Sequence, residues 1–412
     1  MSGLNFLNKL LDGVDVEWLS LGELGDFIRG NGLQKKDFVE SGFPAIHYGQ
    51  IYTRYGLSAD KTFTYVLPEL ANKLRKAQKN DLLLATTSEN DEDVVKPLAW
   101  LGDNVAISGD MMLFRHEQNV KYLAYFFQSE IFQTQKMKYI TGAKVRRVSS
   151  GDLSKIKIPI PSSNNPEKSL AIQSEIVRIL DKFTALTAEL TAELTAELTM
   201  RKKQYNYYRE QLLCFDEAEV EWKTLADVAI LRRGRVMSKG YLEQNAGDYP
   251  VYSSQTARNG MIGSIDTYDF DGEFISWTTD GANAGTVFYR TGKFSITNVC
   301  GLIKIHENYP ISYKYLYYWL SIEAQKHVYS GMGNPKLMSH QVEKITVPIP
   351  FPASPEKSML EQQRIVGILD KLEAITFSLT EGLPREIELR QKQYEYYRDL
   401  LFSFPKPDSV TN

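Results

Sequence analysis

Cysteine is almost absent from this chain, which has only Cys214 and Cys300 among its 412 residues. Two cysteines cannot build the disulfide framework of a small secreted scaffold, and such sparse usage is typical of a reducing cytoplasm. Long apolar runs are missing too, so no membrane-spanning helix is predicted. The N-terminal residues lack a basic segment followed by an apolar core, so we expect no secretory signal peptide. Together these features predict a cytoplasmic protein without membrane segments.

Catalytic motifs are equally scarce. The five histidines lack metal-ligand spacing, and residues 291–295 fail as a phosphate-binding Walker loop. The Asn-Pro pairs at 165–166 and 334–335 lack the second proline and the aromatic residue of an amino-methyltransferase motif. Residues 221–223 have the spacing of a nuclease Glu-x-Lys motif, but no upstream acidic residue accompanies them convincingly. We predict that the chain is not an enzyme and binds no metal or cofactor itself.

What the chain has in abundance is internal repetition. Residues 165–183 (NPEKSLAIQSEIVRILDKF) match 354–372 (SPEKSMLEQQRIVGILDKL) at 11 of 19 positions, 189 residues apart. The same offset relates 201–215 to 390–404. Identity of this degree at one fixed offset indicates a tandem duplication. It predicts variable domains at 1–160 and 216–350, followed by conserved segments at 161–215 and 351–412.

The N-terminus also repeats an internal segment. Residues 10–18 (LLDGVDVEW) resemble 212–222 (LLCFDEAEVEW), and Arg29-Gly30 recurs as Arg233-Gly234. The start of the chain therefore looks like the end of a conserved segment, as if the repeat were circular. We expect a short N-terminal helix and a pseudo-twofold closed arrangement.

Each conserved segment has apolar residues at spacings of three and four, which predicts one amphipathic helix. The first helix would run from about 166 to 213, roughly 65–70 Å at 1.5 Å per residue. Such a long apolar stripe needs a partner, and the second copy can pair with it in antiparallel fashion. Because Pro384 follows Gly382, we expect a bend near 382–384 before the helix resumes. The predicted fold class is α+β, with two mixed α/β domains joined and separated by a coiled coil of two long helices.

Inside the first helix, the unit Thr-Ala-Glu-Leu occurs three times between residues 187 and 198. One interpretation is ordinary helix-forming sequence. The other is a spacer, because each unit adds about 6 Å and about 40° beyond a full turn, close to the rotation of one B-DNA step. The spacer positions would be Thr187, Leu190, Thr191, Leu194, Thr195 and Leu198.

Tyrosines and arginines alternate near the end of each predicted helix. Nucleic-acid stacking is one interpretation, but their place in conserved segments favours packing or a partner subunit. The predicted docking residues are Tyr205, Tyr208, Arg209, Tyr394, Tyr397 and Arg398.

Charge is nearly balanced, with 48 Lys and Arg against 51 Asp and Glu, but nucleic-acid binding depends on where charges lie. Residues 136–157 hold seven basic residues and one acid, and residues 232–239 hold four basic residues and no acid. Such clusters beside glycines suit loops that meet phosphates, although a solvated surface is the alternative. The predicted contacts are Lys144, Arg146, Arg147, Arg232, Arg233, Arg235, Lys239 and Lys336.

Polar and aromatic residues near the start of each variable domain are candidates for contact with base edges, where Arg reads guanine and Asn or Gln reads adenine. They are Tyr48, Gln50, Arg54, Ser253, Ser254, Gln255, Arg258 and Asn259.

Two variable domains, each followed by an Ile-Pro-x-Pro loop and a long helix with Ile-Val-x-x-Leu-Asp-Lys, resemble the specificity subunit of type I restriction–modification systems. The resemblance spans Glu17-Trp18 to Phe404. It implies that each variable domain recognises one half of a bipartite double-stranded DNA target, while the helices set the spacer and dock two methyltransferase subunits. Restriction subunits would join the complex, and S-adenosylmethionine, ATP and Mg²⁺ would be bound by these partners. A stand-alone nuclease or methyltransferase and a structural coiled-coil adaptor are the alternatives.

Overall fold

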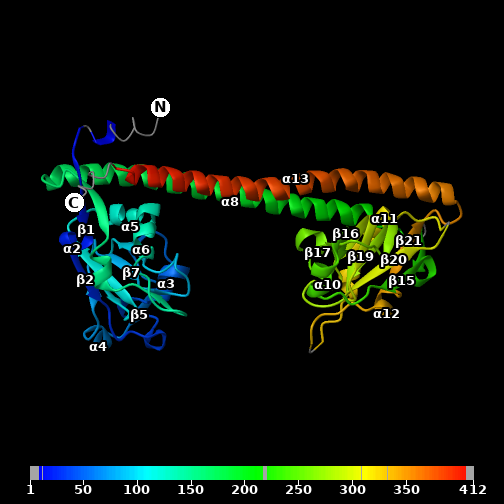
Figure 1. Cartoon of the computed structure of the whole chain (residues 1–412), viewed down its shortest axis with the longest axis horizontal. Coiled ribbons are helices and arrows are strands. Elements are labelled where there is room, and N and C mark those ends of the chain that lie inside the picture. Colours follow the sequence, from blue (N-terminus) through cyan, green and yellow to red (C-terminus); the bar gives the residue numbers. More distant parts are fainter. Residues whose placement is uncertain (1–8, 12, 217–219, 308, 332, 405–412) are drawn as a thin grey trace. The chain divides into compact units, whose positions relative to one another are not determined.

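The computed structural model describes residues 9–11, 13–216, 220–307, 309–331 and 333–404 (Figure 1). The chain divides into two compact units, Met1–Leu194 with Arg385–Asn412, and Thr195–Pro384. Each unit holds one mixed domain and parts of both long helices, α8 (Pro166–Leu212) and α13 (Pro355–Phe402). This confirms the predicted fold class of two mixed domains with two long helices. Of the expected short N-terminal helix, only the helical residues 9–11 lie within the described part.

The first unit is built on two sheets. The larger has the order β2-β11-β7-β9-β4, and its strand β7 is buried throughout because one face packs in the core with α5 and the other in the core with α3. Helices α5 and α6 pack against it, and the side chain of Asn119 caps α5 by accepting from Lys121 N and Tyr122 N. The strands of this sheet are β2 (Gly25–Arg29), β11 (Met111–His116), β7 (Leu82–Ala85), β9 (Lys96–Trp100) and β4 (Ser58–Ala59). The smaller sheet has the order β5 (Thr64–Val66), β3 (Phe43–Ile46), β10 (Val105–Ile107) and β6 (Lys76–Ala77). The remaining elements are α2 (Leu21–Leu24), η1 (Lys35–Asp37), α3 (Tyr48–Thr53), α4 (Pro68–Ala71), β8 (Thr87–Ser88), α5 (Val120–Gln128), α6 (Glu130–Met137), β12 (Arg146–Arg147) and α7 (Ser150–Leu153).

The second unit has a six-stranded sheet with the order β15-β20-β18-β19-β16-β17. Helix α11 packs on it and is capped by the Ser312 hydroxyl, which accepts from Tyr315 N. The strands are β15 (Ala229–Arg233), β20 (Cys300–Ile305), β18 (Phe270–Thr278), β19 (Val287–Ile296), β16 (Ala246–Tyr252) and β17 (Met261–Ile265). The helices are α9 (Leu225–Val228), α10 (Lys239–Gln244), η2 (Ala257–Gly260), α11 (Tyr313–Glu323), η3 (Ala324–His327) and α12 (Ser339–Val342).

A two-stranded ribbon recurs in both units. In the first, β1 (Val16–Ser20) pairs with β13 (Lys157–Pro161), which places Trp18 opposite Pro159. In the second, β14 (Val220–Thr224) pairs with β21 (Thr346–Pro350), which places Trp222 opposite Pro348. The Val-Glu-Trp and Pro-Ile-Pro repeats are therefore the two strands of one duplicated ribbon. The segment predicted as an Ile-Pro-x-Pro loop is a strand in both units.

The C-terminal end of each long helix packs in a domain core, and the end of α13 packs in the core of the first domain, which is the circular arrangement that we expected. Phe402, at the end of α13, is fully buried in the first core, where its ring lies 5.2 Å from Tyr122. Leu213, just after α8, is buried in the second core. The C-terminal helix end thus completes the domain that begins the chain.

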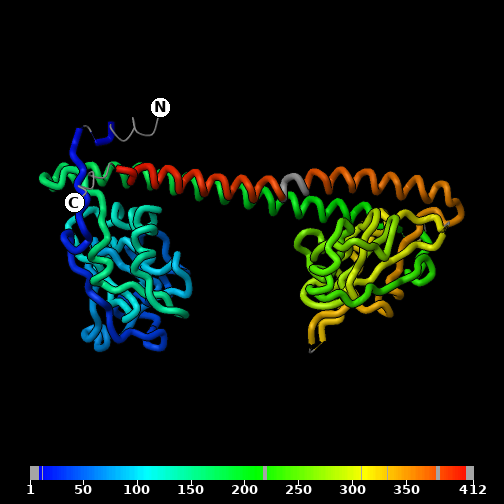
Figure 2. The backbone as a smooth tube through the Cα atoms, viewed as in Figure 1, coloured from blue at the N-terminus to red at the C-terminus, as the bar shows by residue number. Residues whose placement is uncertain are grey.

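Helix α13 continues through Pro384, so the expected break and restart of the helix are wrong, whereas the bend expected near 382–384 stays a prediction. Proline removes one backbone hydrogen bond, and here the turns on both sides continue. Figure 2 follows the backbone of both helices. Within the first unit, Phe183 of α8 stacks on Tyr397 of α13 at 5.4 Å, so these stretches lie side by side. No helix in the described part of the chain is both long and apolar enough to cross a membrane.

Candidate nucleic-acid interface

In the first domain, the predicted basic residues lie on a small hairpin. Arg147 pairs with Thr87 of β8, and Thr141 bridges to Arg147 to close the turn. Lys144 and Arg147 are exposed. Arg146 is half-buried because it forms an ion pair of 2.8 Å with Asp91. The structure therefore brings the three residues together but already gives Arg146 an anionic partner.

Lys136 does not belong to this surface, which corrects the size of the predicted basic cluster. Its side chain is fully buried, and Nζ donates to the carbonyl oxygens of Glu92 and Val94 at 2.8 and 2.9 Å. These bonds hold the acidic loop that carries Asp91. Val95, which follows this loop, has a φ of 69°, a value that is rare for a β-branched residue. Helical position alone could not show that this lysine points inward.

Burial lowers the pKa of Lys136 to about 8, although the nearby carboxylates of residues 91–93 partly oppose the shift. An unfolded lysine titrates near 10.4. Between these values the unfolded chain binds more protons, so the free energy of unfolding rises with pH. We expect Lys136→Met to remove about 1–2 kcal/mol of this rise between pH 7.5 and 9.5, measured by urea unfolding. The exposed neighbour Lys138→Met should leave the slope unchanged, and an equal slope in both variants would contradict the assignment.

The three candidates at the start of the first domain are placed differently. Arg54 is exposed and Tyr48 is half-buried, both at α3. Gln50 is buried: its Oε1 accepts from His47 N at 2.8 Å, and its Nε2 donates to Thr64 Oγ1 at 3.2 Å. The amide of Gln50 thus fastens the start of α3, and only Tyr48 and Arg54 remain accessible.

In the second domain, loop 279–285 connects several candidate residues. Arg233 Nη2 donates to Thr279 Oγ1 at 3.4 Å, Lys336 Nζ lies 3.8 Å from Asp280, and Asn283 Nδ2 donates to Ser254 O at 3.5 Å. None of the predicted contact residues lies in the Gly-Ala-Asn-Ala-Gly segment of this loop, residues 281–285. The structure shows that this loop follows the end of β18 and contacts three of the predicted residues, Arg233, Lys336 and Ser254.

Arg233 has a structural function that is repeated in the first domain. Its Nη2 donates to Asn298 O at 2.7 Å, and Arg29 Nε donates to Gly109 O at 3.0 Å in the equivalent turn. The glycine that follows is required, because a Cβ at Gly234 would lie 2.1 Å from the Ile296 carbonyl oxygen. In each domain, the arginine of the recurring Arg-Gly pair therefore bonds its strand to a neighbouring turn, and the glycine allows the two backbones to approach closely.

The other basic and polar candidates of the second domain are mostly exposed. Arg235 forms an ion pair of 3.0 Å with Asp269 and donates to Tyr241 OH. Gln255 is half-buried, and its Nε2 donates to Met261 O at 2.6 Å. Ser254 is half-buried, and the exposed candidates are Arg232, Arg233, Arg235, Lys239, Arg258, Asn259 and Lys336.

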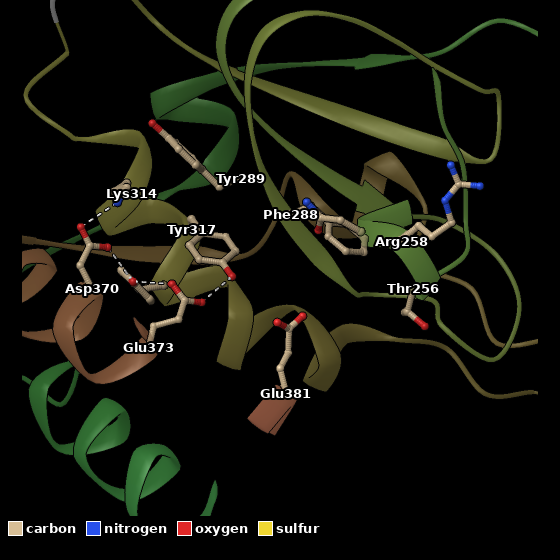
Figure 3. A pocket seen from close by; sticks show the side chains of 11 residues that line it. Thr256, Arg258, Phe288, Tyr289, Lys314, Tyr317, Asp370, Glu373 and Glu381 are labelled. Atoms are coloured by element: carbon tan, nitrogen blue, oxygen red, sulfur yellow. Dashed lines mark hydrogen bonds and ion pairs between the residues drawn. The ribbon is translucent and has the colours of Figure 1, made fainter. Parts of the chain in front are cut away.

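A set of residues that we did not predict fixes each domain on its long helix; we call it the helix anchor. In the first unit, the anchor joins Lys121 and Tyr125 of α5 to Asp181 of α8, with Lys121 Nζ donating to the carboxylate and Tyr125 OH bonding to it at 2.8 Å. In the second unit, Lys314 and Tyr318 of α11 bond to Asp370 of α13, both at 2.7 Å. Figure 3 shows Lys314 facing Asp370.

A buried glutamine completes each anchor. Gln173 Oε1 accepts from Asn119 N at 3.0 Å, and Gln362 Oε1 accepts from Ser312 N at 2.8 Å, each at the N-cap of the domain helix. Their amide groups also donate to Ser169 and Ser358, one turn earlier. The Gln and Leu-Asp positions of the repeat therefore attach each domain to its long helix.

The sequence did hold a signal for the anchor. Residues 119–127 (NVKYLAYFF) and 312–320 (SYKYLYYWL) share Lys, Tyr, Leu and Tyr at the same spacing. This pair is 193 residues apart rather than 189, so an ungapped comparison at the offset of the helices misses it.

The predicted docking residues fall into two groups. Tyr205, Arg209, Tyr394 and Arg398 are half-buried against their own unit. Thr184 Oγ1, for example, bonds to Tyr394 OH at 3.2 Å. The exposed group comprises Tyr208 at 43% and Tyr397 at 36%, together with Tyr207 at 60% and Tyr396 at 63% from the same tyrosine and arginine runs.

Comparison with known proteins decides the family. Residues 13–200 and 217–389 match the Type I restriction modification DNA specificity domain. The chain is 39% identical to the type I restriction enzyme EcoR124I/EcoR124II specificity subunit of Escherichia coli, over 100% of both chains. The chain belongs to the type I restriction–modification specificity subunits. It is also 33% identical to the EcoprrI specificity subunit of Escherichia coli, over 92% of this subunit and 93% of that one.

The fold agrees with this membership. A chain in a solved structure of a type I restriction–modification system superposes with a TM-score of 0.66 at 16% identity, covering 94% of this subunit and 97% of that chain. The subunit is the non-catalytic, DNA-recognising member of its system, and its two mixed domains are target-recognition domains. Among the described residues, no group of three or more His, Cys, Asp or Glu is arranged to hold a metal.

Proposed function

We propose that each target-recognition domain binds one half of a bipartite duplex DNA target, and that the subunit works on DNA in the cytoplasm. The observation that carries this proposal is the duplicated helix anchor. Lys121, Tyr125 and Asp181 in one unit correspond to Lys314, Tyr318 and Asp370 in the other. Two domains held on their helices by the same bonds, but with different outer surfaces, suit a target of two unlike halves.

The phosphate contacts in this proposal come from exposed cations: Lys144 and Arg147 in the first domain, and Arg232 and Lys239 in the second. Arg146, Arg235 and Lys336 contribute where a phosphate replaces their ion pairs with acidic residues. Base edges are contacted by Tyr48, Arg54, Ser254, Arg258 and Asn259, whereas the engaged amides of Gln50 and Gln255 shape the loops. Arg233 braces a turn through its bond to Asn298 O.

We further infer that the long helices set the distance between the half-sites and dock two methyltransferase subunits. The exposed tyrosine pairs near the helix ends, Tyr207-Tyr208 and Tyr396-Tyr397, provide large amphipathic contact area of the kind found at subunit interfaces. Restriction subunits join the assembled complex. The catalytic partners bind S-adenosylmethionine, ATP and Mg²⁺, and adenine methylation takes place on them.

The experiment that tests this function is a genome-wide map of methylated adenines in cells that express the subunit with its methyltransferase partner. Two short conserved sequences separated by a fixed unspecific spacer are expected. A single continuous motif would contradict the bipartite proposal. The mapped site then supplies the duplex probe for the binding experiments below.

Replacing Lys144 and Arg147 with alanine should weaken binding of that duplex and reduce its salt dependence. Each lost phosphate contact lowers the slope of log K against log salt by about 0.9, so a reduction of about 2 is expected. The matched control is Lys73→Ala with Lys79→Ala, two exposed lysines of the same domain. Equal slopes for both double variants would show that the hairpin does not contact phosphate.

A further inference from the structure

Arg290, on β19 of the second target-recognition domain, is a cation placed inside a protein core. Only 2% of the residue is exposed. Its hydrogen bonds go to neutral oxygens: Nε donates to Ser276 Oγ at 3.0 Å, and Nη1 donates to Asn259 O at 2.8 Å. The guanidinium lies over the rings of Tyr252, at 3.6 Å, and Phe288, at 4.4 Å. Two aromatic faces and two fixed acceptors therefore hold the planar group in one orientation.

The acceptor on Asn259 belongs to a loop with an unusual backbone. Arg258, Asn259 and Gly260 have consecutive positive φ values of 51°, 55° and 82°. A non-glycine residue such as Arg258 rarely adopts this conformation unless its surroundings impose it. Gly260 lies at the buried base of the loop, where an added Cβ would be 3.1 Å from Arg290 Nη2. The loop thus rests directly on the Arg290 guanidinium.

Stability alone does not account for an arginine at this position. Burial lowers the pKa of Arg290 to about 10, because the charged form loses its hydration. Its Nη2 is buried and has no hydrogen-bond partner among the described residues. An apolar side chain of similar volume would avoid both costs, as replacements of buried charges in other proteins show. What the arginine provides is a hydrogen-bond donor in a fixed direction to the carbonyl oxygen of Asn259, which lies among the residues with positive φ.

We infer that Arg290 is the positioning residue of the second recognition domain, holding loop 256–260 in the left-handed shape that presents Arg258 and Asn259 to DNA. This rests on the proposed function, in which those two residues contact base edges. Residues 256–259 are exposed, whereas Gly260 beneath them is buried. The side chain of Arg258 points away from Asp370 and Glu373 of the helix (Figure 3). Arg290 acts through Asn259 O, so its effect on recognition is indirect.

The test uses the full subunit in complex with its methyltransferase partner, and duplexes that carry the mapped site or single-base changes in either half. Arg290→Lys keeps the charge and removes the planar fork that bonds Ser276 and Asn259 together. We expect discrimination in the second half-site to fall about tenfold, the range of one lost base contact, with the first half-site unaffected. The salt slope should stay unchanged because the exposed charges remain. The control is Arg75→Lys, the same change at an exposed position of the first domain.

Arg258→Ala separates this inference from the proposed function. Loss of second-half discrimination in both Arg258→Ala and Arg290→Lys, with an unchanged melting temperature for the lysine variant, supports the positioning role. Loss in Arg258→Ala alone overturns that role while leaving the loop contact in place. If Arg258→Ala has no effect, the proposed loop contact is wrong, and the inference falls with it. A lysine variant that melts earlier and loses both half-sites equally shows a purely structural residue, which also overturns the inference.

Discussion

Deleting one Thr-Ala-Glu-Leu unit from α8 is expected to shorten the unspecific spacer of the DNA target by roughly one base pair and to abolish methylation of the original site. Four residues remove about 6 Å of helix and about 40° of rotation, close to one step of B-DNA. Leu190, Leu194 and Leu198 are half-buried, whereas Glu189 and Glu193 are exposed, so the units form a continuous stripe that survives a four-residue deletion. Methylation mapping measures the spacer directly.

Two further variants sharpen the spacer experiment. Insertion of a fourth unit should lengthen the spacer by the same amount. Glu193→Gln changes one unit without changing its length and should leave the site as it was. Altered half-sites, or an unchanged spacer after deletion, would show that the repeat is ordinary helix.

The repeated parts of the fold could be predicted from the sequence because the two copies stay at a constant sequence offset. A constant offset of 189 residues links the helices and the second ribbon strands, and apolar spacing gives the helix boundaries within a residue or two. The circular closure by Phe402 was also foreseeable, from the likeness of residues 10–18 to 212–222. These features depend on local pattern and on the comparison of the chain with itself.

The sites were harder to predict because they depend on burial. Lys136 and Arg290 are both cations in sequence, yet both are buried, and each holds a surface loop through backbone carbonyl groups. Gln50 was assigned to base contact, but its amide is engaged at the start of α3. Residue type suggests a bond to DNA in each case. Only the packing of the sheets shows which side of an element the residue occupies.

The second large effect is expected from the glutamines of the helix anchor. Gln173→Leu preserves the volume of the side chain but leaves Asn119 N and Ser169 Oγ without their buried partner. A buried polar group without a partner costs about 1–3 kcal/mol, and here more than one is affected, so a loss of about 2–4 kcal/mol is expected. Gln362→Leu should act in the same way on Ser312 N and Ser358 Oγ. Thermal unfolding of each variant measures the loss.

Because each anchor lies within its own unit, the functional effects should be separate. Gln173→Leu should weaken recognition of the first half-site, and Gln362→Leu that of the second, when duplexes with changes in one half are compared. Gln204→Leu, the same substitution at an exposed position of α8, is the control for both. If either anchor variant disturbed both half-sites equally, the two domains would not be oriented independently. Separate losses would instead show that the glutamine of each repeat orients its own recognition domain towards its own half of the DNA.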